Sequence, residues 1–236
     1  MRTGEYMSID KLIEVGYQQH AAWKKKAIEN RFEILFALTG ATWIANPIQK
    51  RLEDCLNRLM SFSTPMSPLK GPTGEMNQLV LESRGVFLVS DRLPIEGAWL
   101  ISSVMALLAG NSIVCHVLKS ELALAVQFQT WLRDLDWPYL FQIITVDQYQ
   151  QGLTCEKVAW VAFWGDEAEA IEMRQILAER QGAIIPFISV EQPIELIWHD
   201  FQQPWFLLSL FYEKTISINT TAIGGNTQLL AELSTT

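Results

Sequence analysis

Hydrophobic positions follow a helical period in the first quarter of the chain. One apolar stripe has the spacing i, i+4, i+7, i+8 and i+11, and it consists of Ile48, Leu52, Cys55, Leu56 and Leu59. A stripe of this kind predicts a helix that packs one face against a neighbour, with Cys55 in the core. We expect two long helices over residues 8–62. Ser8 can cap the first, and Asn46 can cap the second, with Pro47 at the first helical position.

The helical pattern stops at residues 61–74, which contain three prolines and two glycines. Such a segment predicts an exposed connection and the best internal boundary. After it, short β-rich runs alternate with helical runs, at residues 78–82, 85–90, 95–109, 112–117, 120–135, 140–146, 158–163, 166–180 and 183–190. Alternation of this kind predicts a Rossmann-like α/β fold, a doubly wound parallel sheet with helices on both faces.

The runs at 86–89, 143–144 and 158–163 are nearly continuous in apolar residues, which is typical of central strands covered on both faces. Beyond residue 192 the pattern weakens. Residues 205–212 favour a short helix, and 215–219 alternate as a strand does before Gly224-Gly225. We therefore expect an N-terminal helical segment (1–70), a Rossmann-like domain (71–191), and an aromatic connection with a C-terminal β tail (192–236).

Charge and composition exclude several classes of function. The net charge of −8 argues against nucleic acid as a partner, and the run Lys24-Lys25-Lys26 is interpreted as a solvated helix face. No apolar leader follows Met1, so a soluble cytoplasmic protein without a transmembrane segment is expected.

The cysteines and histidines do not form a recognisable site. The three cysteines are widely spaced and show no C-x-x-C pair, so reduced buried thiols are expected at Cys55, Cys115 and Cys155. No metal site is expected, because the histidines show no H-x-x-x-H spacing. His199-Asp200 has no evident serine partner and is interpreted as a surface pair.

Three blocks carry a resemblance to a known family. They are Gly-Pro-Thr-Gly-Glu-Met-Asn at 71–77 followed by Arg-Gly-Val at 84–86, then 106–114 with Ala109-Gly110-Asn111, and then 217–226. In this order the chain resembles aldehyde dehydrogenases over residues 8–230. It is most similar to the glutamate-semialdehyde dehydrogenase module of the proline utilization A flavoproteins. The resemblance implies the dinucleotide-binding fold of that family.

The catalytic groups that the resemblance implies are missing. An active member needs a thiolate nucleophile, a carboxylate base and an amide donor for the oxyanion. Residues 191–215 stand where the family inserts the domain that carries the cysteine. The turn at 90–94 reads Ser-Asp-Arg-Leu-Pro and offers no amide, and Glu191 is displaced from the position of the base and is interpreted as a surface carboxylate. We expect no catalytic residue in this chain.

Cofactor binding is also not expected. By the resemblance, His116 replaces a lysine that contacts the adenosine ribose, and it lacks the same cationic reach. The pyrophosphate turn reads Phe-Trp-Gly-Asp at 163–166. We expect Asp166 to cap the next helix, Glu169 to complete a capping box, and Trp164 to fill space beside Gly165. A phosphate within about 4 Å of such a carboxylate would meet repulsion of a few kcal/mol.

The segment that replaces the inserted domain is rich in aromatic residues, which we expect to cover either a partner or the end of the sheet. These residues are Trp198, Phe201, Trp205, Phe206 and Phe211. Trp198, Phe201 and Trp205 are predicted interface residues. So are Asn219, Thr220, Thr221 and Asn226 in the tail, where 219–222 would add to a partner's sheet edge.

The resemblance extends to function. The long, trifunctional proline utilization A proteins carry a non-catalytic C-terminal domain of this kind. It packs on the aldehyde dehydrogenase module and helps to close the cavity through which the intermediate of proline catabolism travels. By the resemblance, the parent oxidoreductase would hold FAD and NAD. Two alternatives are left open: that the parent is peripheral at the membrane, and that the chain forms a homodimer. The alternatives are an NAD-binding sensory module, a fragment of a 1-pyrroline-5-carboxylate dehydrogenase, and a dehydrogenase completed by a partner chain.

Overall fold

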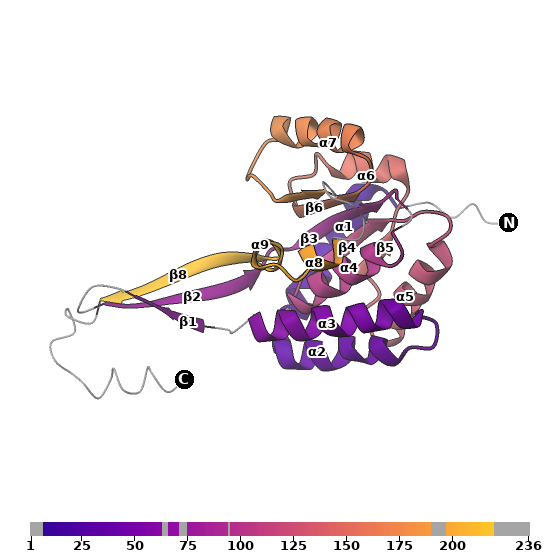
Figure 1. Cartoon of the computed structure of the whole chain (residues 1–236). Helices are drawn as coiled ribbons and strands as arrows, with labels where there is room; N and C mark the ends of the chain where they lie inside the picture. Colours follow the sequence, from indigo (N-terminus) through magenta and orange to yellow (C-terminus); the bar gives the residue numbers. More distant parts are fainter. Residues whose placement is uncertain (1–6, 63–65, 71–74, 94, 190–196, 220–236) are drawn as a thin grey trace.

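A five-stranded parallel sheet forms the centre of the molecule, and a three-stranded antiparallel sheet projects from it (Figure 1). The computed structural model describes residues 7–62, 66–70, 75–93, 95–189 and 197–219. The parallel sheet has the order β5-β4-β3-β6-β7. Its strands are β3 (Val86–Asp91), β4 (Ser112–His116), β5 (Phe141–Ile143), β6 (Val158–Trp164) and β7 (Phe187–Ser189). Counted along the chain this is the 3-2-1-4-5 order of Rossmann-like folds, so the predicted fold class is confirmed.

Helices cover both faces of the parallel sheet. One face carries α1 (Ile9–Trp23), α6 (Val146–Gly152) and α7 (Glu167–Glu179). The other carries α2 (Ile28–Phe36), α3 (Asn46–Phe62), α4 (Ala98–Leu108), α5 (Leu122–Asp134), α8 (Ile197–Asp200) and α9 (Pro204–Ser209). Strand β3 shows why both are needed, because Phe87 and Val89 enter one core and Val86 and Leu88 the other.

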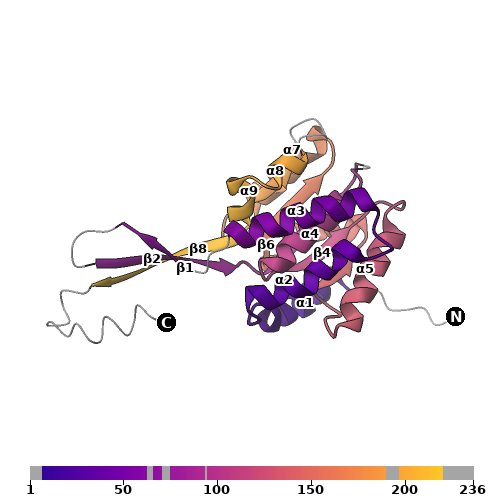
Figure 2. The same ribbon diagram turned by 60° about the horizontal axis from the view of Figure 1, so that its bottom comes forward.

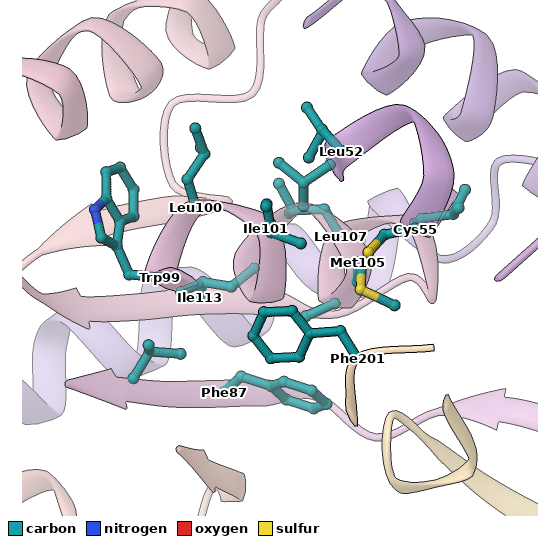
Figure 3. Packing of buried hydrophobic residues seen from close by; sticks show 14 of the residues in the cluster. Leu52, Cys55, Phe87, Trp99, Leu100, Ile101, Met105, Leu107, Ile113 and Phe201 are labelled. Atoms are coloured by element: carbon teal, nitrogen blue, oxygen red, sulfur yellow. The ribbon is translucent and has the colours of Figure 1, made fainter. Parts of the chain in front are cut away.

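The larger core lies between the sheet and helices α3 and α4. Leu52 and Cys55 from α3 lie beside Met105 and Leu107 from α4, above Phe87 of β3 (Figure 3). Cys55 is 1% exposed, and burial raises the pKa of its thiol to about 12. This confirms the predicted core position and makes the thiol unreactive at neutral pH.

The helical segment has one more break than the sequence pattern predicts. Ser8 caps α1 as expected, accepting a hydrogen bond from the backbone N–H of Lys11. The helix ends at Trp23, and Lys24, Lys25 and Lys26 form a turn before α2. The lysines were expected on a helix face, so this interpretation is wrong. After α2 come the short helix η1 (Ala37–Gly40) and the long helix α3, which starts at Asn46 itself rather than after it.

The antiparallel sheet accounts for the other differences. It consists of β1 (Met66–Leu69), β2 (Glu75–Ser83) and β8 (Phe211–Asn219), in the order β1-β2-β8. The segment of β1 was predicted as an exposed connection, and β2 was predicted in the parallel sheet. The first expectation fails because β1 pairs with β2, and the second because β2 pairs along its whole length with β8, from Glu75 opposite Asn219 to Ser83 opposite Phe211. Both views show this antiparallel sheet extending away from the helices (Figures 1 and 2).

The predicted tail strand is confirmed and begins earlier than expected, at Phe211. Residues 220–236, which include Thr220, Thr221 and Asn226, lie outside the described residues, as do the glycine-rich block at 71–74 and Glu191. The domain boundaries after residues 70 and 191 stay predictions. Within the described residues no helix is long and apolar enough to span a lipid bilayer.

The block Ala109-Gly110-Asn111 ends helix α4 and joins the two sheets. Gly110 has φ +96°, and its N–H and that of Asn111 donate to the carbonyls of Leu107 and Ala106, which is the Schellman pattern. The buried Asn111 amide then uses all of its groups. Its oxygen accepts from the N–H groups of Arg84 (2.7 Å) and Gly85 (3.0 Å). Its nitrogen donates to the carbonyls of Ala106 (3.2 Å) and Leu210 (3.0 Å).

Candidate functional site

The candidate site lies at the carboxyl ends of the parallel strands, next to the point where the strand order reverses between β3 and β6. In open α/β sheets this crevice is where ligands bind. The strand ends bring together Ser90 and Asp91 from β3, His116 from β4, and Trp164 with Gly165 from β6. The sequence-predicted positions His116, Trp164, Gly165 and Asp166 therefore come from two strand ends of the same edge.

His116 is turned toward the neighbouring strand. One of its ring nitrogens, Nδ1, lies 3.1 Å from the hydroxyl of Ser90, which is fully buried. Burial, followed by the charge of Arg92, lowers the pKa of His116 below its ordinary value. A neutral histidine paired with a buried serine stabilises the strand end, and it offers no fixed cation to a ligand.

Asp91 is the most perturbed acid of the site, and sequence reasoning missed it. The residue is 0% exposed, and neither carboxylate oxygen has a hydrogen-bond partner in the described part of the chain. Burial, and then the nearby charge of Glu121, raises the pKa of Asp91 to about 8. The one available signal is an aspartate placed directly after the apolar run of β3, where a carboxyl group is difficult to solvate.

Cys115 lies beside this acid at the end of β4. The thiol is fully buried, and burial together with the charge of Asp91 raises its pKa well above the ordinary value. A nucleophilic cysteine needs a lowered pKa and access to substrate. Cys115 has neither property, whereas Cys155 is partly exposed and lies in the loop before β6, away from this edge.

The start of α7 is occupied by the protein's own side chains. Asp166 caps the helix as predicted, accepting a hydrogen bond from the N–H of Glu169 at 2.9 Å. The side chain of Glu169 was expected to complete a capping box, and it instead forms an ion pair with Arg92. Glu169 pairs with Arg92 because the N–H groups of Arg92 and Leu93 donate to the Trp164 carbonyl and hold the Arg92 backbone beside the helix start.

Aromatic rings fill the space beneath this turn. Trp164 is 1% exposed and meets Phe201 edge-on, with 5.4 Å between ring centroids. A Cβ atom at position 165 would overlap the Phe163 ring, so the turn requires glycine. The geometry gives Gly165 a packing reason that needs no phosphate.

Of the two roles weighed for the aromatic segment, the structure favours covering the sheet end. Phe201 and Phe206 are buried against Trp164 and Trp160, and their own ring centroids are 4.9 Å apart. Phe201 lies among the core residues (Figure 3), so its expected place at an interface is corrected. Trp198 is half-buried, with the Arg51 guanidinium 4.1 Å from its ring centroid. Trp205 is 51% exposed and still available to a partner.

A cavity opens beside His116, at the ends of β4 and β5. Its volume is about 710 Å³. The wall is largely apolar and includes Val117, Leu122, Ile143 and Val146, with Lys119 at the edge. Small-molecule sites have volumes in this range. The expected absence of a cofactor gives no reason for a cavity of this size at the carboxyl ends of β4 and β5.

No group of three His, Cys, Asp or Glu side chains that could hold a metal ion occurs among the described residues. His199 lies in α8 with its Nε2 atom 2.7 Å from the side-chain nitrogen of Gln203, and Asp200 follows it on the same short helix. These two residues therefore sit on the aromatic segment rather than at the strand ends.

The fold is similar to that of several solved structures. The chain is similar to a variant of proline utilization A (PutA) from Bradyrhizobium japonicum, with a TM-score of 0.64 and 21% identity. It is also similar to PutA from Bdellovibrio bacteriovorus inactivated by N-propargylglycine, with a TM-score of 0.66 and 15% identity, and to an NAD-dependent benzaldehyde dehydrogenase from Corynebacterium glutamicum, with a TM-score of 0.62 and 14% identity.

The matches cover 77%, 78% and 77% of this chain, but only 22%, 23% and 46% of the respective relatives. The chain thus spans less than a quarter of the length of the PutA proteins that it matches. No protein-family model matches the sequence, and no curated protein does. The fold is that of aldehyde dehydrogenases, close to PutA, as the sequence resemblance implied.

Proposed function

We propose that this chain is a non-catalytic aldehyde-dehydrogenase-like domain with an architectural role in a proline-catabolic oxidoreductase. The observation that carries the proposal is the ion pair between Arg92 and Glu169 beside the Asp166 cap. The Asp166 carboxylate occupies the start of α7 and Arg92 is already paired with Glu169, at the turn where the resemblance to aldehyde dehydrogenases would place the pyrophosphate. Catalytic turnover is not supported either, because Cys115 is a buried thiol with a raised pKa.

In this proposal the domain packs on the aldehyde dehydrogenase module of the same or a partner chain and helps to close the substrate-channelling cavity. FAD and NAD belong to the parent enzyme. Strand β8 supports a docking role, because β2 pairs with one of its edges and no described strand pairs with the other. A free strand edge accepts a further strand through backbone hydrogen bonds alone. Trp205 and Asn219 are the described residues that we place at this interface.

Calorimetric titration with NAD+ tests the absence of a working cofactor site. We expect no saturable binding at micromolar concentrations, since the Asp166 carboxylate at the helix start repels phosphate and other contacts would have to offset a few kcal/mol. The chain should also produce no NADH from glutamate semialdehyde and NAD+. Saturable micromolar binding of NAD+ would contradict the proposal.

A deletion tests the architectural role. Removing the equivalent of residues 215–236 from a full-length PutA protein should slow channelling between its two active sites, while proline oxidation at the flavin continues. The measurement is the lag before NADH appears when proline is the substrate. Unchanged channelling and unchanged aldehyde oxidation would count against the role as a lid.

The second candidate is an NAD-binding sensory module, and the cavity of about 710 Å³ beside His116 favours it. It could hold the adenosine half of a nucleotide while the pyrophosphate stays outside the α7 turn. The matched variant is Leu122→Trp, which fills the cavity from a side chain that is 43% exposed. If NAD+ binds the wild-type chain and Leu122→Trp abolishes binding, this candidate replaces the first.

A further inference from the structure

A second cavity lies at the opposite end of the fold from the start of α7, where β2 ends and β8 begins in the antiparallel sheet. Its volume is about 530 Å³. We call it the basic pocket, and its lining residues that matter here are Lys24, Lys25, Lys26, Arg31, Leu81 and Phe211. The α1–α2 turn and the first turn of α2 form one wall, and β2 with the start of β8 forms the other.

The charge of the basic pocket is opposite to that of the whole protein. Four lining side chains are cationic, and one, Glu82, is acidic, in a chain of net charge −8. Glu82 is paired with Lys214 at 3.1 Å, so its charge is offset from outside the pocket. In the described part of the chain, Lys24 and Lys25 form no ion pair and are exposed. Four cationic side chains around one pocket favour a bound anion.

A buried arginine holds the lysine turn in place. Arg31 is 7% exposed, and its Nη1 atom donates to the carbonyls of Lys24 (3.2 Å) and Lys26 (3.0 Å), while Nε donates to the Leu108 carbonyl (2.9 Å). Lys26 is held further by the Trp137 ring, whose centroid is 5.5 Å from the ammonium nitrogen. The backbone of the three lysines is therefore ordered before any ligand arrives, which reduces the entropy cost of binding.

The remaining wall is apolar. Ile28, Leu81, Ala109 and Phe211 line the pocket below the lysines. His20 and Ser83 connect the two walls through a contact of 3.0 Å, and burial lowers the pKa of His20 to about 4, so this contact adds no charge at neutral pH. A ligand that suits both parts needs an anionic head and an apolar body.

We propose that the basic pocket binds a small organic anion, with its carboxylate or phosphate group at Lys24 and Lys25 and its apolar body against Leu81 and Phe211. This site is separate from the strand-end crevice and does not depend on the architectural role. Because the basic pocket lies between the α1–α2 turn and the antiparallel sheet, an occupant would stiffen the attachment of that sheet.

The test is a titration of the isolated chain with hexanoate, hexyl phosphate, hexanol and inorganic phosphate, followed by calorimetry and by amide chemical shifts. We expect saturable binding of hexanoate or hexyl phosphate, with shifts at Lys25, Leu81 and Phe211, and the stronger of the two identifies the head group. Hexanol, which lacks the charge, and inorganic phosphate, which lacks the body, should each bind at least tenfold more weakly.

The double variant Lys24→Ser/Lys25→Ser should weaken binding at least tenfold. The matched control, Lys50→Ser/Lys70→Ser, removes two exposed lysines elsewhere and should change the affinity less than about twofold. The proposal is overturned if neither anion saturates below about 10 mM, if the pocket variant binds as the wild type does, or if the control loses as much affinity. Equal affinity for inorganic phosphate and hexyl phosphate would also overturn it, because the apolar wall would then contribute nothing.

Discussion

Phe201→Ala is expected to lower the free energy of unfolding by about 3–5 kcal/mol, the usual cost of removing a buried phenyl ring. Phe201 is 1% exposed, and its ring meets those of Trp164, Trp198 and Phe206. The truncation would leave a cavity under the α7 turn that these rigid rings cannot fill by small shifts. Urea unfolding followed by far-UV circular dichroism measures the change.

The neighbouring Trp205→Ala provides the control, since the indole is 51% exposed and its loss should cost less than about 1 kcal/mol in the isolated chain. Equal effects of the two variants would contradict the view that this segment covers the sheet end. Under the proposed architectural role, Trp205→Ala in a longer parent protein is expected to weaken the docking of the domain.

Asp91→Asn is expected to change how stability depends on pH. The pKa of Asp91 is about 8 in the folded protein and about 3.9 in an unfolded chain, so between these values the folded state holds one more proton. The free energy of unfolding then falls as pH rises, by up to about 1.4 kcal/mol per pH unit, until Asp91 ionises near pH 8. Asparagine keeps the shape and has no proton to lose, so the variant should not show this fall.

Two histidines act in the opposite direction below their ordinary pKa. Burial lowers the pKa of His20 to about 4 and that of His116 in the same direction, so each makes the folded state less stable as pH falls below about 6.5. The contribution of Asp91 is therefore clearest between about pH 6.5 and 8. Urea unfolding of the wild type, Asp91→Asn and the control Asp147→Asn, whose carboxylate is exposed on α6, measures it. Parallel pH profiles for the wild type and Asp91→Asn would refute the buried-acid assignment.

The elements that the sequence predicts well are those whose burial depends on local pattern. The apolar run at 95–109 becomes α4, with every residue from Ala98 to Leu108 buried, and the runs at 85–90 and 158–163 become the central strands β3 and β6. Continuous apolar sequence can only be satisfied inside such a fold. The cap at Asp166 was equally predictable, because it depends on a residue and the helix directly after it.

The features that the sequence did not reveal depend on partners far away along the chain. Strand β1 contains Pro68 and forms because β2 lies beside it. Helix α6 was missed for another reason: its capping box between Thr145 and Gln148 is local, but the helix is short and mostly polar and so shows no apolar period. Glu169 leaves its expected local partner for Arg92, which is 77 residues away. The unpaired acid at position 91 and the basic pocket likewise exist only once separate elements meet.

The four hydrogen bonds of Asn111 have a dynamic consequence. Its side chain binds the backbone at Arg84 and Gly85, where β2 passes into β3, and at Leu210, just before β8. Two connections of the antiparallel sheet, from β2 to β3 and from α9 to β8, are thus fastened to one amide at the end of α4. The antiparallel sheet cannot detach without breaking the hydrogen bonds of Asn111. The amide protons of Arg84 and Gly85 should therefore exchange with deuterium only when the entire domain opens.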